Sequence, residues 1–127
     1  MKPTDAQLLK ILEVGHDTSL RGGGLSLLDA LQGCQYLHLR SSIDAEDLLP
    51  LIRADRSIAR QWILYSNDKR TSGGWYLAEE TCEVGTLGDP PQSVVCPSIE
   101  EAVALYVIRE LDFWSNYTRK DAPDARP

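Results

Sequence analysis

The chain is poor in the residues that most catalytic and metal sites require. Its 127 residues include only three cysteines, Cys34, Cys82 and Cys96, and two histidines, His16 and His38. The sequence contains no C-x-x-C, H-x-x-x-H or EF-hand spacing, so it predicts neither a metal site nor a cofactor. Three cysteines without a pairing pattern are typical of buried thiols in a reducing cytoplasm.

Long hydrophobic runs are also missing. No apolar stretch approaches the roughly 18 residues that a membrane-spanning helix needs. The opening residues, MKPTDAQLLKILEVG, are interrupted by charged and polar side chains, which argues against a secretory signal. The hydrophobic content of 43% and the charged content of 25% are ordinary for a globular domain. These features predict a cytoplasmic protein that does not contact a membrane.

Lysine and arginine are absent from one long segment, residues 71–108. This segment holds six acids, whereas residues 1–70 hold nine basic and nine acidic side chains and residues 109–127 hold four of each. The whole net charge of −6 therefore lies in residues 71–108. The simpler interpretation is a solvated surface, and the alternative is an acidic face that attracts a basic partner. Direct binding of nucleic acid is disfavoured, because it needs a basic patch.

The residues that are present predict a helical N-terminal half. Thr4 and Gln7 match a capping box and open a helix over residues 4–14. A second short helix is predicted over residues 26–32. Residues 41–61 also fit a helix, with Ser42 or Asp44 as its N-cap and with Pro50 expected to kink or divide it. The alternation in residues 35–40 predicts a short strand, with a helical extension as the alternative.

The second half of the chain is predicted to be rich in strands. QWILYS (61–66) and GWYLAE (74–79) are expected to form a hairpin, and CEVGTL (82–87) and QSVVC (92–96) two further strands. Ser98 and Glu101 match a second capping box and open a helix over residues 98–114. The predicted fold class is α+β, an antiparallel sheet of three to five strands packed against helices, with a long C-terminal helix. Residues 1–117 would form this single domain, and residues 118–127 are predicted to be disordered.

Catalytic candidates are few. The glycines Gly22–Gly24 precede a predicted helix and could cradle a phosphate, but the segment lacks the ending of a P-loop, so a connector fits better. Cys34 and His38 would approach each other only on a helix, and neither has the sequence context of a nucleophile–base pair. The sequence therefore predicts a protein that is not an enzyme.

The candidates for partner binding lie around the predicted hairpin. Trp75 and Tyr76 are neighbours on one strand and so point to opposite faces of the sheet. One of the two belongs in the core, and the other is a candidate exposed anchor, as aromatic residues often are at interfaces. The partner-binding set comprises these two rings and nearby acids: Asp68, Trp75, Tyr76, Glu79, Glu80 and Glu83.

A family resemblance rests on the order of segments in residues 60–114. The strand-rich stretch RQWILYSNDKRTSGGWYL is followed by CEVGTL and by the helix SIEEAVALYVIRELDFW. This order resembles small immunity proteins of bacterial toxin systems, including those of contact-dependent growth inhibition. Such proteins are cytoplasmic and often acidic, and they neutralise a cognate toxin, commonly a nuclease with a basic cleft, by direct binding.

The resemblance implies an immunity protein, or antitoxin, that binds and blocks a cognate protein toxin. The acids of residues 71–108 predict that this toxin is basic. Two alternatives stay open. The chain could be a non-enzymatic adaptor or regulatory domain of another bacterial assembly. It could also be a small enzyme or small-molecule binder that uses the Gly22–Gly24 loop.

Overall fold

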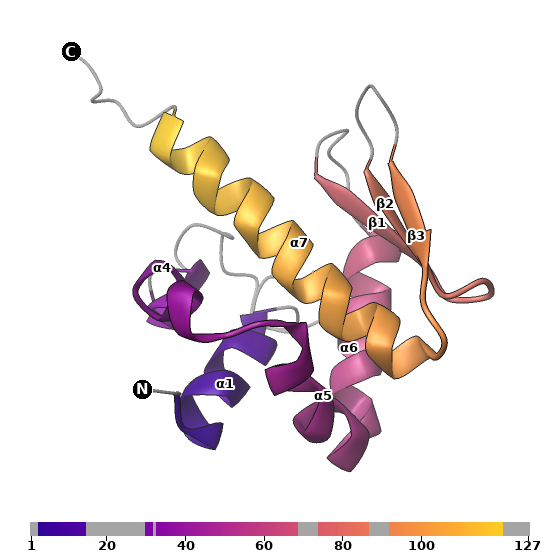
Figure 1. The fold of residues 1–127 in the computed structure, drawn as a ribbon, viewed down its shortest axis with the longest axis horizontal. Helices are drawn as coiled ribbons and strands as arrows, with labels where there is room; N and C mark the ends of the chain where they lie inside the picture. The colour runs from indigo at the N-terminus through magenta and orange to yellow at the C-terminus, as the bar shows by residue number, and fades with distance from the viewer. Residues whose placement is uncertain (1–2, 15–29, 32, 69–73, 87–91, 121–127) are drawn as a thin grey trace.

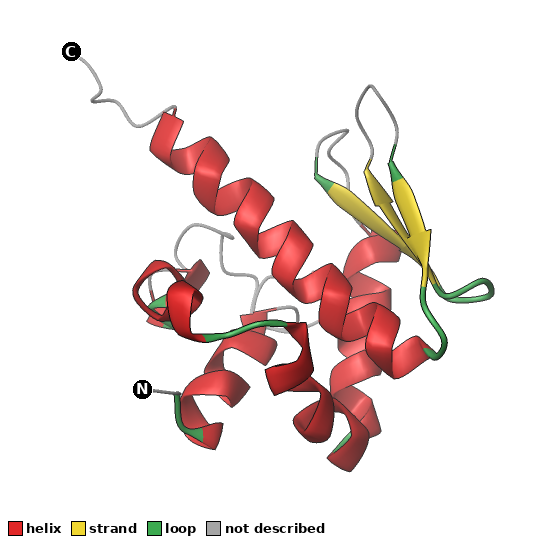
Figure 2. Ribbon diagram, in the orientation of Figure 1, coloured by secondary structure: helices red, strands yellow, loops and turns green. Residues whose placement is uncertain are grey.

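The chain folds into an α+β structure in which helices pack against a three-stranded antiparallel sheet (Figures 1 and 2). The computed structural model describes residues 3–14, 30–31, 33–68, 74–86 and 92–120, with the backbone alone for Asp68 and residues 116–120. The elements in chain order are α1 (Asp5–Leu12), α4 (Tyr36–Leu39), the 3-10 turn η1 (Arg40–Ser42), α5 (Ala45–Ala54), α6 (Arg56–Asp68), β1 (Trp75–Ala78), β2 (Glu83–Thr86), β3 (Ser93–Val95) and α7 (Ile99–Lys120).

Capping residues fix the starts of three helices. The Thr4 hydroxyl accepts a hydrogen bond from the Gln7 amide nitrogen, and the Gln7 side chain accepts one from the Thr4 nitrogen, which completes the predicted capping box of α1. Asp44 caps α5 in the same reciprocal way. The Ser98 hydroxyl accepts from the nitrogen of Glu101 at the start of α7. Each cap satisfies amide groups that the first helical turn leaves unbonded.

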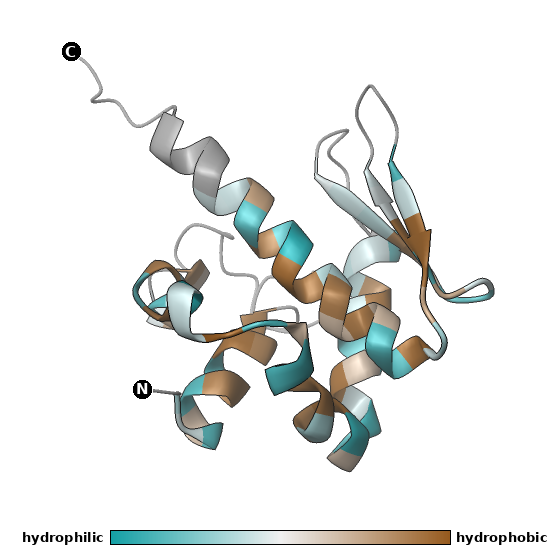
Figure 3. Cartoon of the chain, viewed as in Figure 1, coloured by the Kyte–Doolittle hydropathy of each residue, from teal (hydrophilic) through white to brown (hydrophobic). Residues whose placement is uncertain are grey.

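The core lies between α7, α5, α6 and the inner side of the sheet, and Figure 3 colours the hydrophobic residues of these elements brown. Val103 and Val107 of α7 are completely buried, as the predicted apolar face of this helix requires. Trp62 of α6 is also fully buried, and its indole nitrogen donates to the Leu12 carbonyl of α1 at 2.9 Å. The rings of Trp62 and Tyr106 meet edge to face at 6.2 Å between centroids. Burial of these apolar surfaces is the main stabilising contribution.

The prediction of a strand at residues 61–66 is wrong, because this segment belongs to helix α6. The predicted hairpin with residues 74–79 is therefore also wrong, and β1 pairs with β2 instead. The buried positions Ala59, Trp62 and Ile63 follow helical spacing, and the side chain of Asp55 accepts from the Ser57 amide as an N-cap does. Tertiary packing of one helical face overrides the strand propensity of the aromatic residues.

Two further predictions need correction. The segment around residues 35–40 is the short helix α4 and not a strand, with Tyr36 and Leu39 buried on one side. Pro50 lies within α5 and does not divide the helix, since the chain divides into α5 and α6 at Asp55. Of the predicted helix over residues 26–32, only residues 30–31 are described, and both are helical and buried. The Gly22–Gly24 loop and most of the predicted tail fall outside the described residues.

A polar network ties α4 to α7. Arg40 donates from Nε and Nη2 to the two carboxylate oxygens of Asp112 at 2.8 and 3.0 Å, a bidentate pair. The Tyr36 hydroxyl donates to the same carboxylate at 2.8 Å. Burial of the Tyr36 ring, followed by the charge and hydrogen bond of Asp112, raises the pKa of this phenol. The network holds the N-terminal helices against the middle of α7.

Candidate functional site

The free edge of β1 is closed by side chains from α6 and α7. The Trp75 nitrogen donates to Oε1 of Glu110 at 2.8 Å, and the Leu77 nitrogen donates to Oγ of Ser66 at 2.9 Å. The Tyr106 hydroxyl donates to the Trp75 carbonyl at 3.2 Å. These bonds occupy the backbone groups that an edge strand otherwise offers to another chain. Sequence patterns do not predict this arrangement, because its residues come from three separate elements.

The inner face of the sheet belongs to the core. Leu77 lies opposite Val84 in the register, and both side chains are buried. Trp75 is two residues before Leu77 and shares its face, where its ring packs against the core and under the guanidinium of Arg109 at 5.6 Å. Of the two candidate anchors, Trp75 is therefore the core residue.

The outer face of the sheet carries the other candidate anchor, Tyr76. We call the side chains of Tyr76, Ala78, Glu83, Gly85, Ser93 and Val95 the outer sheet face, because the register pairs them in two rows on the side opposite Leu77 and Val84. In Figure 1 the helices lie on the other side of the sheet. Val95 is 65% exposed and Ser93 is exposed, so this face meets solvent along β3.

The Tyr76 ring lies against Gly85. A Cβ atom at Gly85 would come within 2.6 Å of Cε2 and the hydroxyl oxygen of Tyr76, so only glycine leaves room for the ring. Burial, a hydrogen bond to Glu83 and the charge of Glu83 raise the pKa of the Tyr76 phenol, while a hydrogen bond from Ser93 lowers it. Glu83 and Ser93 thus hold the ring in place on the outer sheet face.

The open edge of the sheet is β3, and it is short. The Thr86 nitrogen donates to Gln92 and the Cys96 nitrogen donates to Cys82, at 2.8 and 2.9 Å. Because alternate residues of an antiparallel ladder turn toward the partner strand, Ser93 and Val95 direct their backbone groups to the open edge. Pro97 follows and has no N–H to offer. A short edge ended by proline is a poor template for a further strand.

The acidic segment is partly neutralised within the chain. Glu79 lies 3.6 Å from Arg60 and Glu101 lies 3.8 Å from Arg53, in two exposed ion pairs. Such surface pairs contribute little to stability, but they place arginines of α5 and α6 beside acids of the sheet and α7. Glu80 is exposed in the turn between β1 and β2. The side chain of Asp68, the remaining predicted contact, lies outside the described residues.

Cys34 and His38, which the sequence did not favour as a nucleophile–base pair, lie in different environments. Cys34 is buried and its thiol lies 3.6 Å from the Leu31 carbonyl, whereas His38 is exposed on α4. His16 lies outside the described residues. Within the described part of the chain, no three His, Cys, Asp or Glu side chains gather in a way that could hold a metal ion.

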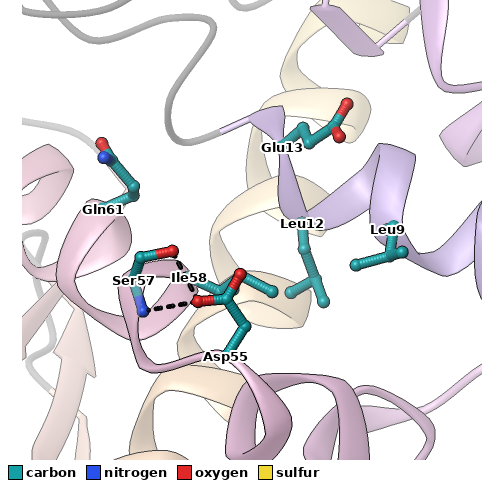
Figure 4. A pocket seen from close by; sticks show the side chains of 7 residues that line it. All are labelled: Leu9, Leu12, Glu13, Asp55, Ser57, Ile58 and Gln61. Atoms are coloured by element: carbon teal, nitrogen blue, oxygen red, sulfur yellow. Dashed lines mark hydrogen bonds between the residues drawn. The ribbon is translucent and has the colours of Figure 1, made fainter.

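A hollow of about 220 Å³ lies between the end of α1 and the start of α6 (Figure 4). It is open and lined by Leu9, Leu12, Glu13, Asp55, Ser57, Ile58 and Gln61. Its one close polar pair is Ser57 with Asp55, where the hydroxyl and the backbone nitrogen both donate to Oδ1 at 2.7 and 3.0 Å. These bonds lower the pKa of Asp55 and cap α6. Helix capping accounts for this pair without any chemistry.

No protein-family model, no curated protein and no solved structure matches the chain. Among the helices described, none is both long and apolar enough to cross a membrane. The outer sheet face with the neighbouring acids is therefore the candidate site on geometry alone.

Proposed function

We propose that this chain is a non-enzymatic binding protein that uses the outer sheet face to hold a basic protein partner. Following the resemblance of residues 60–114, the partner is a cognate bacterial toxin, and the chain is the immunity protein that blocks it in the cytoplasm. The observation that carries the proposal is the outer sheet face, which bears the half-buried Tyr76 ring and Val95, a residue that is 65% exposed. An aromatic ring beside an exposed apolar side chain and polar groups is typical of a partner surface.

The partner docks on the face of the sheet and not on its edge. The edge of β1 is occupied by Glu110 and Ser66, and the edge of β3 offers only the backbone groups of Ser93 and Val95 before Pro97. The face offers a fixed aromatic ring, an exposed valine and a carboxylate, Glu83. An aromatic anchor surrounded by polar groups is the arrangement found at the energetic centre of many interfaces.

The negative charge of residues 71–108 favours a basic partner. The segment 71–108 contributes the whole net charge of −6, and Glu80 and Glu83 lie beside and on the outer sheet face. Complementary charge raises the rate of encounter and discourages acidic partners. A nuclease with a basic cleft has the surface that this face would occlude, and occlusion requires no catalytic group on the chain.

The test first captures proteins that bind the chain and then measures the growth of cells that express them. The immobilised full chain is exposed to a lysate of the source organism, and each captured protein is then produced from an inducible promoter, with or without this chain. We expect a captured basic protein that arrests growth when expressed alone and is harmless when the chain is present. Tyr76→Ala should lose protection, and Leu37→Ala, which alters an exposed side chain on α4, is the matched control that should keep it.

The outcomes separate the parts of the proposal. A captured protein that binds through Tyr76 but never arrests growth would contradict the immunity function and leave an adaptor. Protection that survives Tyr76→Ala, in a variant whose circular dichroism matches the parent, would remove the outer sheet face from the interface. An acidic captured partner would overturn the charge argument.

A further inference from the structure

Two of the three cysteines lie opposite each other at the end of the sheet. The register pairs Glu83 with Val95, and one step beyond the ladder it pairs Cys82 with Cys96. The Cys96 nitrogen donates to the Cys82 carbonyl at 2.9 Å, so one backbone hydrogen bond joins the two residues across the strands. Cα atoms that are paired across antiparallel strands lie about 4.5 to 5.5 Å apart, within the range of roughly 4.4 to 6.8 Å that a disulfide spans.

Solvent access favours these two thiols over the third. Both side chains are intermediate in burial, so a small reagent can reach them, whereas Cys34 is buried. Burial raises the pKa of Cys96, and the charges of Glu101 and Cys82 raise it further, so the share of this thiol that is ionised, and with it the rate of exchange, increases as the pH rises. Cys82 has a φ of 57°, the conformation that ends the turn before β2.

We propose that Cys82 and Cys96 form a reversible intramolecular disulfide when the chain meets a low-molecular-weight disulfide such as oxidised glutathione. The thiolate of one cysteine attacks the reagent, forms a mixed disulfide and releases one glutathione thiolate. The thiolate of the second cysteine then attacks the protein sulfur of the mixed disulfide and releases the other glutathione. The two protein thiols lose two electrons, which reduce the reagent, and the two departing thiolates take up the two protons.

The bond would close residues 82–96 into a loop and lock β2 to β3 beneath the outer sheet face. It would also fix the residue that precedes Pro97 and Ser98, and so the start of α7. A cross-link of this length stabilises the folded chain by restricting the unfolded one. We expect the midpoint of thermal unfolding to rise by about 10 °C on oxidation.

The test uses the purified full chain, oxidised glutathione and alkylation of the remaining thiols after unfolding. The reduced chain should take up three alkyl groups, and the oxidised chain one. Cys34→Ser should still form the bond. Cys82→Ser and Cys96→Ser should not, and each should instead carry a glutathione adduct that reduction removes.

Peptide mapping identifies the bonded cysteines. Because residues 71–108 contain no lysine or arginine, trypsin leaves both cysteines on one peptide. A protease that cuts after glutamate separates them at Glu83, so the two fragments should stay joined until a reductant is added. Three alkylated thiols after oxidation, a bond to Cys34, or a disulfide between two chains would each overturn the proposal.

Discussion

Glu110 carries a carboxylate that lies in the interior of the fold. Its side chain is fully buried, and it accepts hydrogen bonds from the Tyr65 hydroxyl, the Trp75 nitrogen and the Trp114 indole nitrogen at 2.8, 2.8 and 2.9 Å. These donors come from α6, β1 and α7. One acidic side chain thus joins three elements, and it does so at the edge of the sheet that a partner would otherwise find open.

Replacing Glu110 with leucine should be strongly destabilising. The substitution puts an apolar side chain of similar size in place of the carboxylate and leaves three part-buried donors without their acceptor. A buried donor that loses its acceptor costs about 1–3 kcal/mol. We expect the free energy of unfolding in urea to fall by about 3 kcal/mol or more. Glu110→Gln retains one strong acceptor oxygen and should lose less. Equal stability of the leucine variant and the parent would show that these bonds contribute nothing net.

Ser115, unlike Glu110, is a buried polar residue whose side chain makes no hydrogen bond in the described part of the chain. Its side chain is 3% exposed, and its hydroxyl finds no hydrogen-bond partner among the described residues. A buried hydroxyl without a partner carries a desolvation cost, and alanine is also the better helix former. Ser115→Ala should therefore raise the free energy of unfolding by about 1 kcal/mol. A loss of stability in the same urea titration would mean that the hydroxyl is bonded after all.

At the scale of elements, Gly85 controls how β2 fits between its neighbours. A side chain there would collide with the Tyr76 ring on one side and lie 2.7 Å from the Gln92 carbonyl oxygen on the other. Gly85→Ala should therefore destabilise the domain by about 1–3 kcal/mol, the usual cost of overpacking. Adding Tyr76→Ala should recover part of this loss, because it removes only the contact with the ring. No recovery in the double variant would place the whole cost on the backbone contact.

The elements that were predicted correctly are those with local signals. Thr4, Asp44 and Ser98 mark their helices through caps that involve residues three positions away. Residues 61–66 were mispredicted because aromatic and aliphatic side chains suit strands, while the long-range contacts that make them helical are invisible in a single sequence. The contact of Trp62 with Leu12 joins residues 50 positions apart.

The candidate site was predictable only in part, for the same reason. Alternation along a strand showed that Trp75 and Tyr76 face opposite ways. Deciding which of them faces the core required the pairing of Leu77 with Val84 and the contact of Tyr76 with Gly85, which depend on three-dimensional register. The pairing of Glu79 and Glu101 with arginines of α6 and α5 was likewise hidden by their distance in the sequence.

For the whole molecule, buried tyrosines predict how stability depends on pH. Burial first, and then the neighbouring carboxylates Asp112 and Glu110, raises the pKa of Tyr36, Tyr65 and Tyr106 above the ordinary value. The folded chain therefore holds these phenol protons more tightly than the unfolded chain. Below about pH 10 the phenols are protonated in both states and their contribution is constant, and it is lost as the pH rises further.

With three such groups, the free energy of unfolding should fall by about 4 kcal/mol per pH unit above pH 10. Phenolate absorbance should appear together with unfolding and not before it. Tyr65→Phe, compared with the parent at each pH, should reduce the slope by about a third. An unchanged slope in this variant would mean that other groups govern alkaline unfolding.

The distribution of charge over the molecule predicts the kinetics of partner binding, on the basis of the proposed function. Glu80→Lys reverses an exposed charge beside the outer sheet face, whereas Glu13→Lys makes the same change at the end of α1, which lies away from the sheet in Figure 1. At low salt, Glu80→Lys should slow association with the captured partner by about three- to tenfold and leave dissociation nearly unchanged, because rim charges act on encounter. The difference between the two variants should shrink as salt rises, since screening acts over about 8 Å at physiological ionic strength. Equal association rates for the two variants at low salt would show that the acids of the sheet do not steer the partner.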